Sequence, residues 1–336
     1  MSDLGWVIWD AYCGLGGWSS GALAALEDAG MTATFYGVDS DKVPLEAWKR
    51  NISKSPAVVA AKTLCKSIGT NAMEWPSENG RLVMHWSPCC QPFSKARITP
   101  APESAVDGGL SQIRALLDLV LEKGYARWTI EEVAHPQIVA LVKEYSQKFP
   151  SKIAGERFDA ASYGCPSERR RLIVSSPELL RDLKTRTTTE YQSPKRALLD
   201  AGIEPASAFY RNGNVSCAPR PVSMPAFTIT ASHPLVFCNQ DRSLVRCMNP
   251  KESAVLVGLP PDWELPNGSG AAQRAVGNVV APPLAKAIVA SALVLQEPEE
   301  PVTATAPVTR AEVAAMITAA IAPLRVSLRK RIREGE

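Results

Sequence analysis

The chain has 336 residues, of which 46% are hydrophobic and 21% are charged, an ordinary composition for a globular protein. This length allows a sizeable core, in two domains or in one domain with an insertion. The formal net charge of +3 is too small to indicate a nucleic-acid partner by itself, so the question depends on local clusters of basic residues.

The cysteines and histidines do not follow a metal-binding pattern. Eight cysteines are present, none in a Cys-x-x-Cys pair, and there are only three histidines. We therefore predict no metal site. We expect no signal peptide, and the longest apolar stretch, near Ile288 to Leu295, is expected to be too short to cross a membrane. We expect a soluble, reduced, cytoplasmic protein.

The first elements alternate between strand and helix. Residues Trp6 to Tyr12 predict a buried strand, followed by a glycine-rich turn. Ser19 to Ala29 has apolar residues at helical spacing and ends before Gly30. Thr34 to Asp39 then predicts a second strand.

The same alternation continues to about residue 175. Further strands are predicted at Leu82 to Trp86, Trp128 to Glu131 and Leu172 to Ser175, and helices at Leu110 to Lys123 and Pro136 to Lys148. Alternating strands and helices predict an α/β fold with a doubly wound, mostly parallel sheet.

The second half of the chain is less regular. Ser175 to Pro219 is basic and without clear periodicity, and predicts a small second lobe or insertion. Helical spacing returns at Glu252 to Leu256 and at Pro283 to Leu295. Glu297 to Pro307 has the composition of a linker, and Arg310 to Arg333 predicts an amphipathic helix with a basic end.

The first turn, Asp10 to Gly17, has the glycines of a nucleotide-binding loop but departs from the dinucleotide fingerprint, because position 19 is not glycine. A ligand without a pyrophosphate explains this, such as a nucleoside that carries an amino-acid tail. Asp39 ends the second strand, where a carboxylate can bind ribose hydroxyls. S-adenosylmethionine is one such ligand, although many nucleotide-binding sheets have a glycine-rich turn.

The proline-bounded loop Pro88 to Ser94, which holds Cys89 and Cys90, comes directly after the predicted strand that ends at Trp86. Loops at the carboxyl ends of strands carry the chemistry of open α/β sheets. This placement favours a nucleophile. The alternative is that the cysteine is a small buried apolar residue, as most cysteines in cytosolic proteins are.

Seven segments in order resemble the motifs of the cytosine-C5 DNA methyltransferase family, a family of S-adenosylmethionine-dependent enzymes. They are Asp10 to Gly17, the pair Asp39 and Asp41, Pro88 to Ser94, Glu131 to Val133, Tyr163 to Arg171, Pro225 to Thr230, and Gly277 to Pro283. The resemblance covers residues 6 to 295 and implies a Rossmann-like methyltransferase domain with a small second lobe.

The resemblance assigns the catalytic roles. Carbon 5 of cytosine is too poor in electrons to attack a methyl sulfonium, and addition of a thiolate to carbon 6 overcomes this. Cys90 is the expected nucleophile, and Glu131 the acid at nitrogen 3. Arg171 is expected to hold the cytosine carbonyl oxygen, and Arg169 to steady the loop.

The resemblance also implies the cofactor, S-adenosylmethionine, and the residues that line its site. Asn71 is placed among them as the stand-in for a Gly-Asp-Ile segment that the chain lacks. The expected cofactor-binding residues are Asp10, Tyr12, Gly14, Gly16, Asp39, Asn71, Pro88, Asn278 and Val280.

Structural alternatives remain for several of these residues. Glu131 has the alternative of pairing with an arginine on a sheet edge, and Arg169 to Arg171 that of forming only a phosphate patch. Cys89 is expected to be a spectator. Glu132 replaces the asparagine of the family pattern and adds a second carboxylate near the catalytic one.

The implied substrate is cytosine in double-stranded DNA, flipped out of the helix because a stacked base is unreachable. The irregular segment Lys95 to Leu110 is the predicted lid. The region expected to read the target, residues 175–219, has only 45 residues, which predicts short or relaxed sequence specificity with much of the affinity from phosphate contacts.

Three rival functions remain: the same chemistry on RNA such as tRNA, transfer of a bulkier group from a modified donor, and a catalytically retired DNA-binding protein. The C-terminal helix is expected either to self-associate or bind a partner, or to tether nucleic acid. No membrane partner is expected, and a prokaryotic or phage origin fits the resemblance. The predicted divisions are 1–175 catalytic and cofactor-binding, 176–250 target-recognition lobe, 251–296 return to the catalytic domain, 297–308 linker, and 309–336 helix.

Overall fold

The structure is a computed structural model, and it describes residues 5–68, 73–94, 99–188, 192–211, 218–239, 241 and 243–295. The predicted linker and C-terminal helix lie outside the described residues, and so does Asn71.

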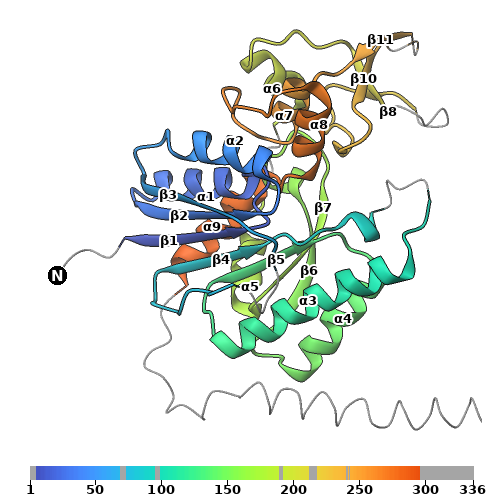
Figure 1. Ribbon diagram of the computed structural model, residues 1–336. Coiled ribbons are helices and arrows are strands. Elements are labelled where there is room, and N and C mark those ends of the chain that lie inside the picture. The colour runs from blue at the N-terminus through green and yellow to red at the C-terminus, as the bar shows by residue number, and fades with distance from the viewer. Residues whose placement is uncertain are drawn as a thin grey trace, which may run out of the picture.

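A twisted sheet of seven strands forms the centre of the described chain, in the order β3-β2-β1-β4-β5-β7-β6 (Figure 1). The strands are β1 (Trp6–Ala11), β2 (Ala33–Asp39), β3 (Val58–Cys65), β4 (Leu82–Trp86), β5 (Trp128–Glu132), β6 (Ala154–Asp159) and β7 (Arg170–Ser175). The first five pair in parallel, whereas β7 runs antiparallel to both β5 and β6. The predicted doubly wound, mostly parallel sheet is confirmed.

Helices cover both faces of the sheet, because alternate residues of each strand point to opposite sides. Ile8, Val83 and Ile173 belong to one hydrophobic cluster, and their neighbours Trp9 and Met84 to the other. The first cluster includes residues of α1 (Gly17–Asp28), α2 (Lys42–Ile52), α5 (Pro177–Thr185) and α9 (Pro282–Val294). The second includes residues of α3 (Glu103–Lys123) and α4 (Pro136–Lys148).

The last described helix, α9, returns to the start of the fold and packs against α1. A Cβ added at Gly21 of α1 would lie 2.3 Å from Pro282 O, so glycine permits this close approach. The buried Arg127 secures the other end of α9, because its guanidinium donates to Ala292 O and Leu295 O at 2.9 and 2.8 Å. These contacts join residues that the sequence places far apart.

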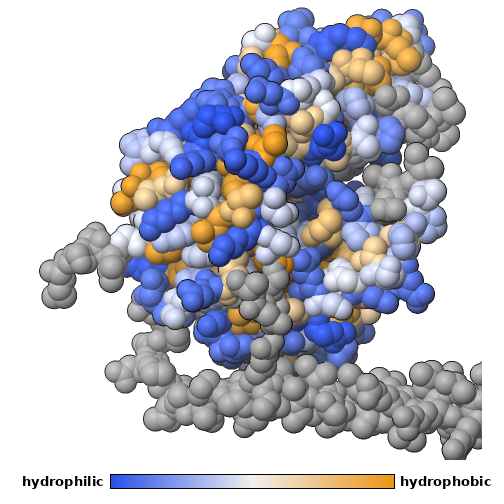
Figure 2. Space-filling view, in the orientation of Figure 1, coloured by the Kyte–Doolittle hydropathy of each residue, from blue (hydrophilic) through white to orange (hydrophobic). Residues whose placement is uncertain are grey.

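A smaller antiparallel sheet, ordered β11-β10-β8-β9, forms a second lobe above the main sheet in Figure 1. Its strands are β8 (Ala208–Arg211), β9 (Arg220–Pro221), β10 (Leu235–Cys238) and β11 (Leu244–Cys247), with α6 (Pro194–Asp200), α7 (Pro250–Leu256) and α8 (Ser269–Asn278) beside it. In Figure 2 the described surface is mainly hydrophilic on the face shown. The predicted small second lobe is confirmed.

Two sequence predictions about irregular segments are wrong. Residues 103–110, expected to belong to an irregular lid, form the first turns of α3, which begins at Glu103. Residues 177–185 form α5 because Leu179, Leu180 and Leu183 supply an apolar face that the basic residues between them obscured. These leucines are buried against the main sheet although they follow the predicted division at residue 175, which itself stays a prediction.

One stretch of the described chain, Ser269–Val294, is apolar and long enough by composition to cross a membrane. It consists of two helices, α8 and α9, and 67% of its most apolar window is buried inside the fold. The stretch therefore belongs to the core of the fold, and it gives no indication of a membrane location.

Candidate active site

The residues predicted to carry chemistry meet at the carboxyl ends of β1, β4 and β5. The strand order changes direction between β1 and β4, and a sheet of this kind has its binding crevice at such a point. Ser87, which follows β4, donates its backbone N–H to Ala11 O at the end of β1 (3.1 Å). This bond holds the start of the cysteine loop beside the glycine-rich turn.

The cysteine loop is fixed by a short helical turn and by α3. Pro88 is buried, Cys89 exposed and Cys90 half-buried. Phe93 donates its backbone N–H to Cys90 O at 3.0 Å, which closes the turn Gln91–Phe93. The Phe93 ring lies against Gly109 of α3, where an added Cβ would come within 2.6 Å of it. The helix that begins inside the predicted lid therefore supports the thiol.

The environment of Cys90 disfavours its ionisation in the free protein. Burial raises the pKa of the thiol to about 11, helped by the negative charges of Glu132 and Glu131. Arg171 and Arg169 act in the opposite direction but do not offset these effects. A thiolate at neutral pH therefore requires a change in the charges around it.

Glu131 and Arg171 come together across neighbouring strands. Arg171 Nε lies 2.8 Å from Glu131 Oε1, with both side chains largely buried. The contact is an ion pair without hydrogen-bond alignment, since Glu131 Oε1 has no hydrogen-bond partner among the described residues. Arg171 also donates through Nη1 to Arg170 O at 2.8 Å. The predicted acid and the predicted carbonyl-binding cation thus touch directly.

Arg169 is buried and faces backbone. Its guanidinium donates to Ile229 O at 3.3 Å and to Gly277 O at 3.1 Å, so it links three of the predicted motif segments. Burial, and then the charge of Arg171, lowers its pKa to about 10, which leaves it cationic at neutral pH. This geometry fits the predicted steadying of the site.

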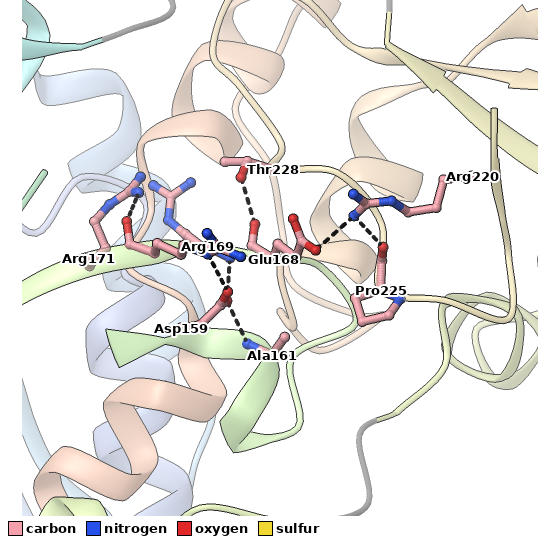
Figure 3. Close-up of polar contacts among 9 residues, drawn as sticks. Asp159, Ala161, Glu168, Arg169, Arg171, Arg220, Pro225 and Thr228 are labelled. Atoms are coloured by element: carbon pink, nitrogen blue, oxygen red, sulfur yellow. Dashed lines mark hydrogen bonds and ion pairs between the residues drawn. The ribbon is translucent and has the colours of Figure 1, made fainter. Parts of the chain in front are cut away.

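The arginine segment and the segment Pro225 to Thr230 are joined by a network drawn in Figure 3. Ser167 and Ala226 form a parallel bridge, and Thr228 donates its hydroxyl to Glu168 O at 2.8 Å. Arg220 contacts the Glu168 carboxylate at 3.1 Å and donates to Pro225 O at 2.9 Å. The small lobe is thereby fastened to the strand that carries Arg171.

The glycine-rich turn after β1 adopts conformations that few side chains allow. Tyr12 has a φ of 61°, the one non-glycine residue with positive φ in the described chain. Such strain is often kept at binding sites. Gly14 has a φ of 49°, and an added Cβ there would project into open space, in the room that a ligand would take. Gly16, with a φ of 91°, lies so close to Trp48 that an added Cβ would come within 2.6 Å of its ring.

Asp39 ends β2 beside this turn and helps to shape it. Its Oδ2 accepts from Gly14 N–H at 2.8 Å, and its Oδ1 from Asp41 N–H at 2.8 Å. Burial raises its pKa. Each oxygen retains a lone pair for a ligand hydroxyl. An open glycine turn beside an acidic residue suits a nucleoside ligand such as S-adenosylmethionine.

The other predicted cofactor residues lie in different settings. Asp10 is buried and accepts from the Ser19 hydroxyl at 2.6 Å, and burial raises its pKa to about 7, so it supports the turn from within. Val280 is buried, with its carbonyl against Gly17 at the start of α1, whereas Asn278 is exposed at the end of α8. Asn71 lies outside the described residues.

The structure thus brings Cys90, Glu131, Arg169 and Arg171 into one cluster. Sequence reasoning missed residues that support the site, such as Trp48 under Gly16, and Asp159, which accepts from Arg169 N–H at 2.9 Å and from Arg170 Nε at 3.1 Å. The sequence positions of Trp48 and Asp159 give no sign of these roles. Asp159 reaches the arginines because it ends β6, where it pairs with Arg170 of β7.

A comparison with known families found a match in the second half of the chain. Residues 208–293 match the model of a family described as C-5 cytosine-specific DNA methylase. The matched part begins with β8 of the small lobe and includes the segments Pro225 to Thr230 and Gly277 to Pro283. No curated protein sequence matches the chain.

Solved structures resemble the chain at low identity. A protein encoded within an E. coli prophage, assigned as a DNA modification methyltransferase, has a TM-score of 0.59 at 14% identity, covering 85% of this chain and 98% of that one. A mutant of Spodoptera frugiperda DNMT2 has a TM-score of 0.48 at 13% identity, covering 86% and 99%. At 14% identity the first likeness establishes the fold.

Proposed function

We propose that this chain, whose resemblance to the cytosine-C5 DNA methyltransferases is supported by the family match over residues 208–293, transfers a methyl group from S-adenosylmethionine to carbon 5 of cytosine in DNA. The observation that carries the proposal is the cluster of Cys90, Glu131 and Arg171 beside an open glycine turn.

Each member of the cluster has a place in the proposed chemistry. The Cys90 thiolate would form a bond to carbon 6 of a flipped cytosine, and Glu131, after taking up a proton from solvent, would deliver it to nitrogen 3 as negative charge builds in the ring. Arg171, already beside Glu131, would hold the ring carbonyl oxygen. Carbon 5 would then accept the methyl group as its bond to the sulfonium sulfur breaks, which releases S-adenosylhomocysteine. A base would remove the proton at carbon 5 as the thiolate leaves, and nitrogen 3 would return its proton to Glu131.

The proposed cofactor site is the turn between β1 and α1. Its open side at Gly14 would admit the nucleoside, and the free lone pairs of Asp39 would take the ribose hydroxyls. Bound there, the cofactor supplies an electrophilic methyl group. Asp10 and Gly16 hold the turn in shape. The Tyr12 hydroxyl donates to Ile68 O at 3.4 Å, and burial raises its pKa.

The proposed DNA-binding surface lies where the small lobe joins the segment that carries Arg171, next to the cluster of Cys90 and Glu131. The lobe is small, which favours short or relaxed target specificity. We place the protein in the cytoplasm of a prokaryotic cell, encoded by the cell or by a phage.

The proposed function is tested by methyl transfer from labelled S-adenosylmethionine to duplex DNA and, in parallel, to tRNA. We expect label in DNA, and mass spectrometry of the nucleosides to identify 5-methylcytosine. Label in tRNA alone would move the substrate to RNA, a heavier cytosine adduct would reveal a modified donor, and label in neither would contradict catalysis.

Salt dependence gives a second expected result. Arg170, which lies between Arg169 and Arg171 in the chain, and Arg196 of α6 are paired on the surface with Asp159 and Asp200, and surface pairs of this kind contribute little and can exchange for phosphates. Duplex affinity should therefore fall by about tenfold or more between 50 and 200 mM salt, as expected for a few phosphate contacts. Fluorescence anisotropy across this range measures the slope, and a flat line would argue against phosphate-based binding.

A further inference from the structure

Two adjacent carboxyl groups end β5. Among the described residues, Glu131 has a cationic partner, Arg171 at 2.8 Å, whereas Glu132 has none. The Glu132 side chain is buried, with the residue only 1% exposed. Its Oε2 accepts from Val133 N–H at 2.8 Å, and its Oε1 is buried without a hydrogen-bond partner among the described residues. A buried carboxylate in such a position is costly, and uptake of a proton removes the cost.

The surroundings of Glu132 favour the protonated form. Burial, and then the charge of Glu131, raises the pKa of Glu132 to about 8, against the opposing effects of Val133 N–H and Arg171. The nearby His135 is occupied elsewhere, because its ring caps α4 by accepting from Gln137 N–H at 3.4 Å. At neutral pH the carboxyl of Glu132 is therefore mostly neutral.

The charge of Glu132 bears directly on the nucleophile. Among the charged groups that act on the Cys90 thiol, Glu132 disfavours the thiolate most, ahead of Glu131. Arg171 and Arg169 favour it. With Glu132 neutral, the two arginines outweigh the single remaining carboxylate. With Glu132 ionised, the charges cancel and a thiolate would be a net excess of negative charge in a buried site.

We propose that Glu132 is a positioning residue that must hold a proton for Cys90 to ionise and attack. The inference deepens the proposed function, since it takes Cys90 as the nucleophile. The thiol releases its proton to solvent, and neutral Glu132 leaves the two cations Arg169 and Arg171 against the single carboxylate of Glu131 at the sulfur. Ionisation of Glu132 at alkaline pH makes the thiol harder to ionise, so the thiolate fraction rises less steeply with pH. A neutral side chain at this position also matches the asparagine of the family pattern, which Glu132 replaces.

The test measures alkylation of Cys90 by iodoacetamide between pH 6.5 and 9.5, quantified on the Cys90 peptide by mass spectrometry. Parent and Glu132→Gln proteins are compared in a Cys89→Ala background, so that the neighbouring thiol does not interfere. The two should react at rates within about twofold at pH 7, where both side chains are neutral. At pH 9.5 the Glu132→Gln protein should react about tenfold faster, equivalent to one pKa unit at the thiol.

Controls keep the result specific. Glu144→Gln removes an exposed carboxylate that pairs with Lys148, and should leave the profile unchanged. If Glu132→Gln does not fold, the parent profile alone decides: the logarithm of its rate should rise with unit slope below pH 8 and more slowly above. A uniform unit slope, identical profiles in both proteins, or a faster Glu132→Gln protein already at pH 7 would overturn the proposal.

Alkylation requires neither cofactor nor DNA, so the two proposals fail separately. A break near pH 8 in a protein that does not methylate nucleic acid would support the role of Glu132 and reject the proposed function. Methylation by a protein without that break would do the reverse.

Discussion

Replacing Cys90 with alanine should abolish methyl transfer, with a loss of about 10³-fold or more, because no other thiol replaces it at carbon 6. Its neighbour Cys89 is exposed, whereas Cys90 is half-buried between Glu132, Glu131, Arg171 and Arg169. Transfer of labelled methyl groups to duplex DNA measures the loss, and bisulfite sequencing of DNA from expressing cells gives the same comparison in vivo.

Covalent trapping separates the roles of the two thiols. DNA that contains 5-fluorocytosine should remain attached to the parent and to Cys89→Ala, because fluorine at carbon 5 blocks the final elimination. Cys90→Ala should give no adduct. An adduct on Cys90→Ala, or its loss in Cys89→Ala alone, would assign the nucleophile to the other sulfur, and no adduct on any protein with active donor present would favour a DNA-binding role without catalysis.

Replacing Glu131 with glutamine should lower kcat by about 10²–10⁴-fold, the usual contribution of a positioned acid. Glutamine keeps the shape of the side chain but cannot deliver a proton, and it removes the charge that pairs with Arg171 at 2.8 Å. Single-turnover methylation at saturating DNA and cofactor measures the effect on chemistry without the effect on binding.

The matched control is Glu144→Gln on the exposed face of α4, which should change kcat by less than about twofold. Thermal unfolding of both variants shows whether Glu131→Gln folds. A folded Glu131→Gln protein with the parental rate would show that the carboxyl only pairs with Arg171, the structural alternative that the sequence left open.

The fold followed from local patterns to a large extent. β4 at Leu82–Trp86 and α4 at Pro136–Lys148 lie where the sequence predicts them, because continuous apolar runs and helical spacing record burial directly. The strands Val58–Cys65 and Ala154–Asp159 were missed. They lie on the two edges of the sheet, where no residue of Val58–Cys65 and only Phe158 of Ala154–Asp159 is fully buried, so neither strand shows the continuous burial of a central strand.

The sequence predicted the candidate site as a set of motifs. Which side chains of these motifs touch one another is seen only in the tertiary structure. The position of Arg169 in the chain does not reveal that its guanidinium binds the carbonyls of Ile229 and Gly277, since these residues are brought to it by the return of the chain. Likewise, Gly277 follows the family pattern in sequence, but only the packing shows that an added Cβ would lie 2.1 Å from Ala231 N.

The sequence by itself determined the residue types and their order. A thiol follows one buried strand, two glutamates end the next strand, and arginines stand at the start of a later one. Tertiary structure decided which of them meet and in what charge state. The antiparallel pairing of β7 with β5 brings the Arg171 side chain within 2.8 Å of the Glu131 carboxylate. Burial at the end of β5 then separates two adjacent glutamates into one ion pair and one proton-holding acid, because desolvation and charge depend on three-dimensional neighbours and not on sequence position.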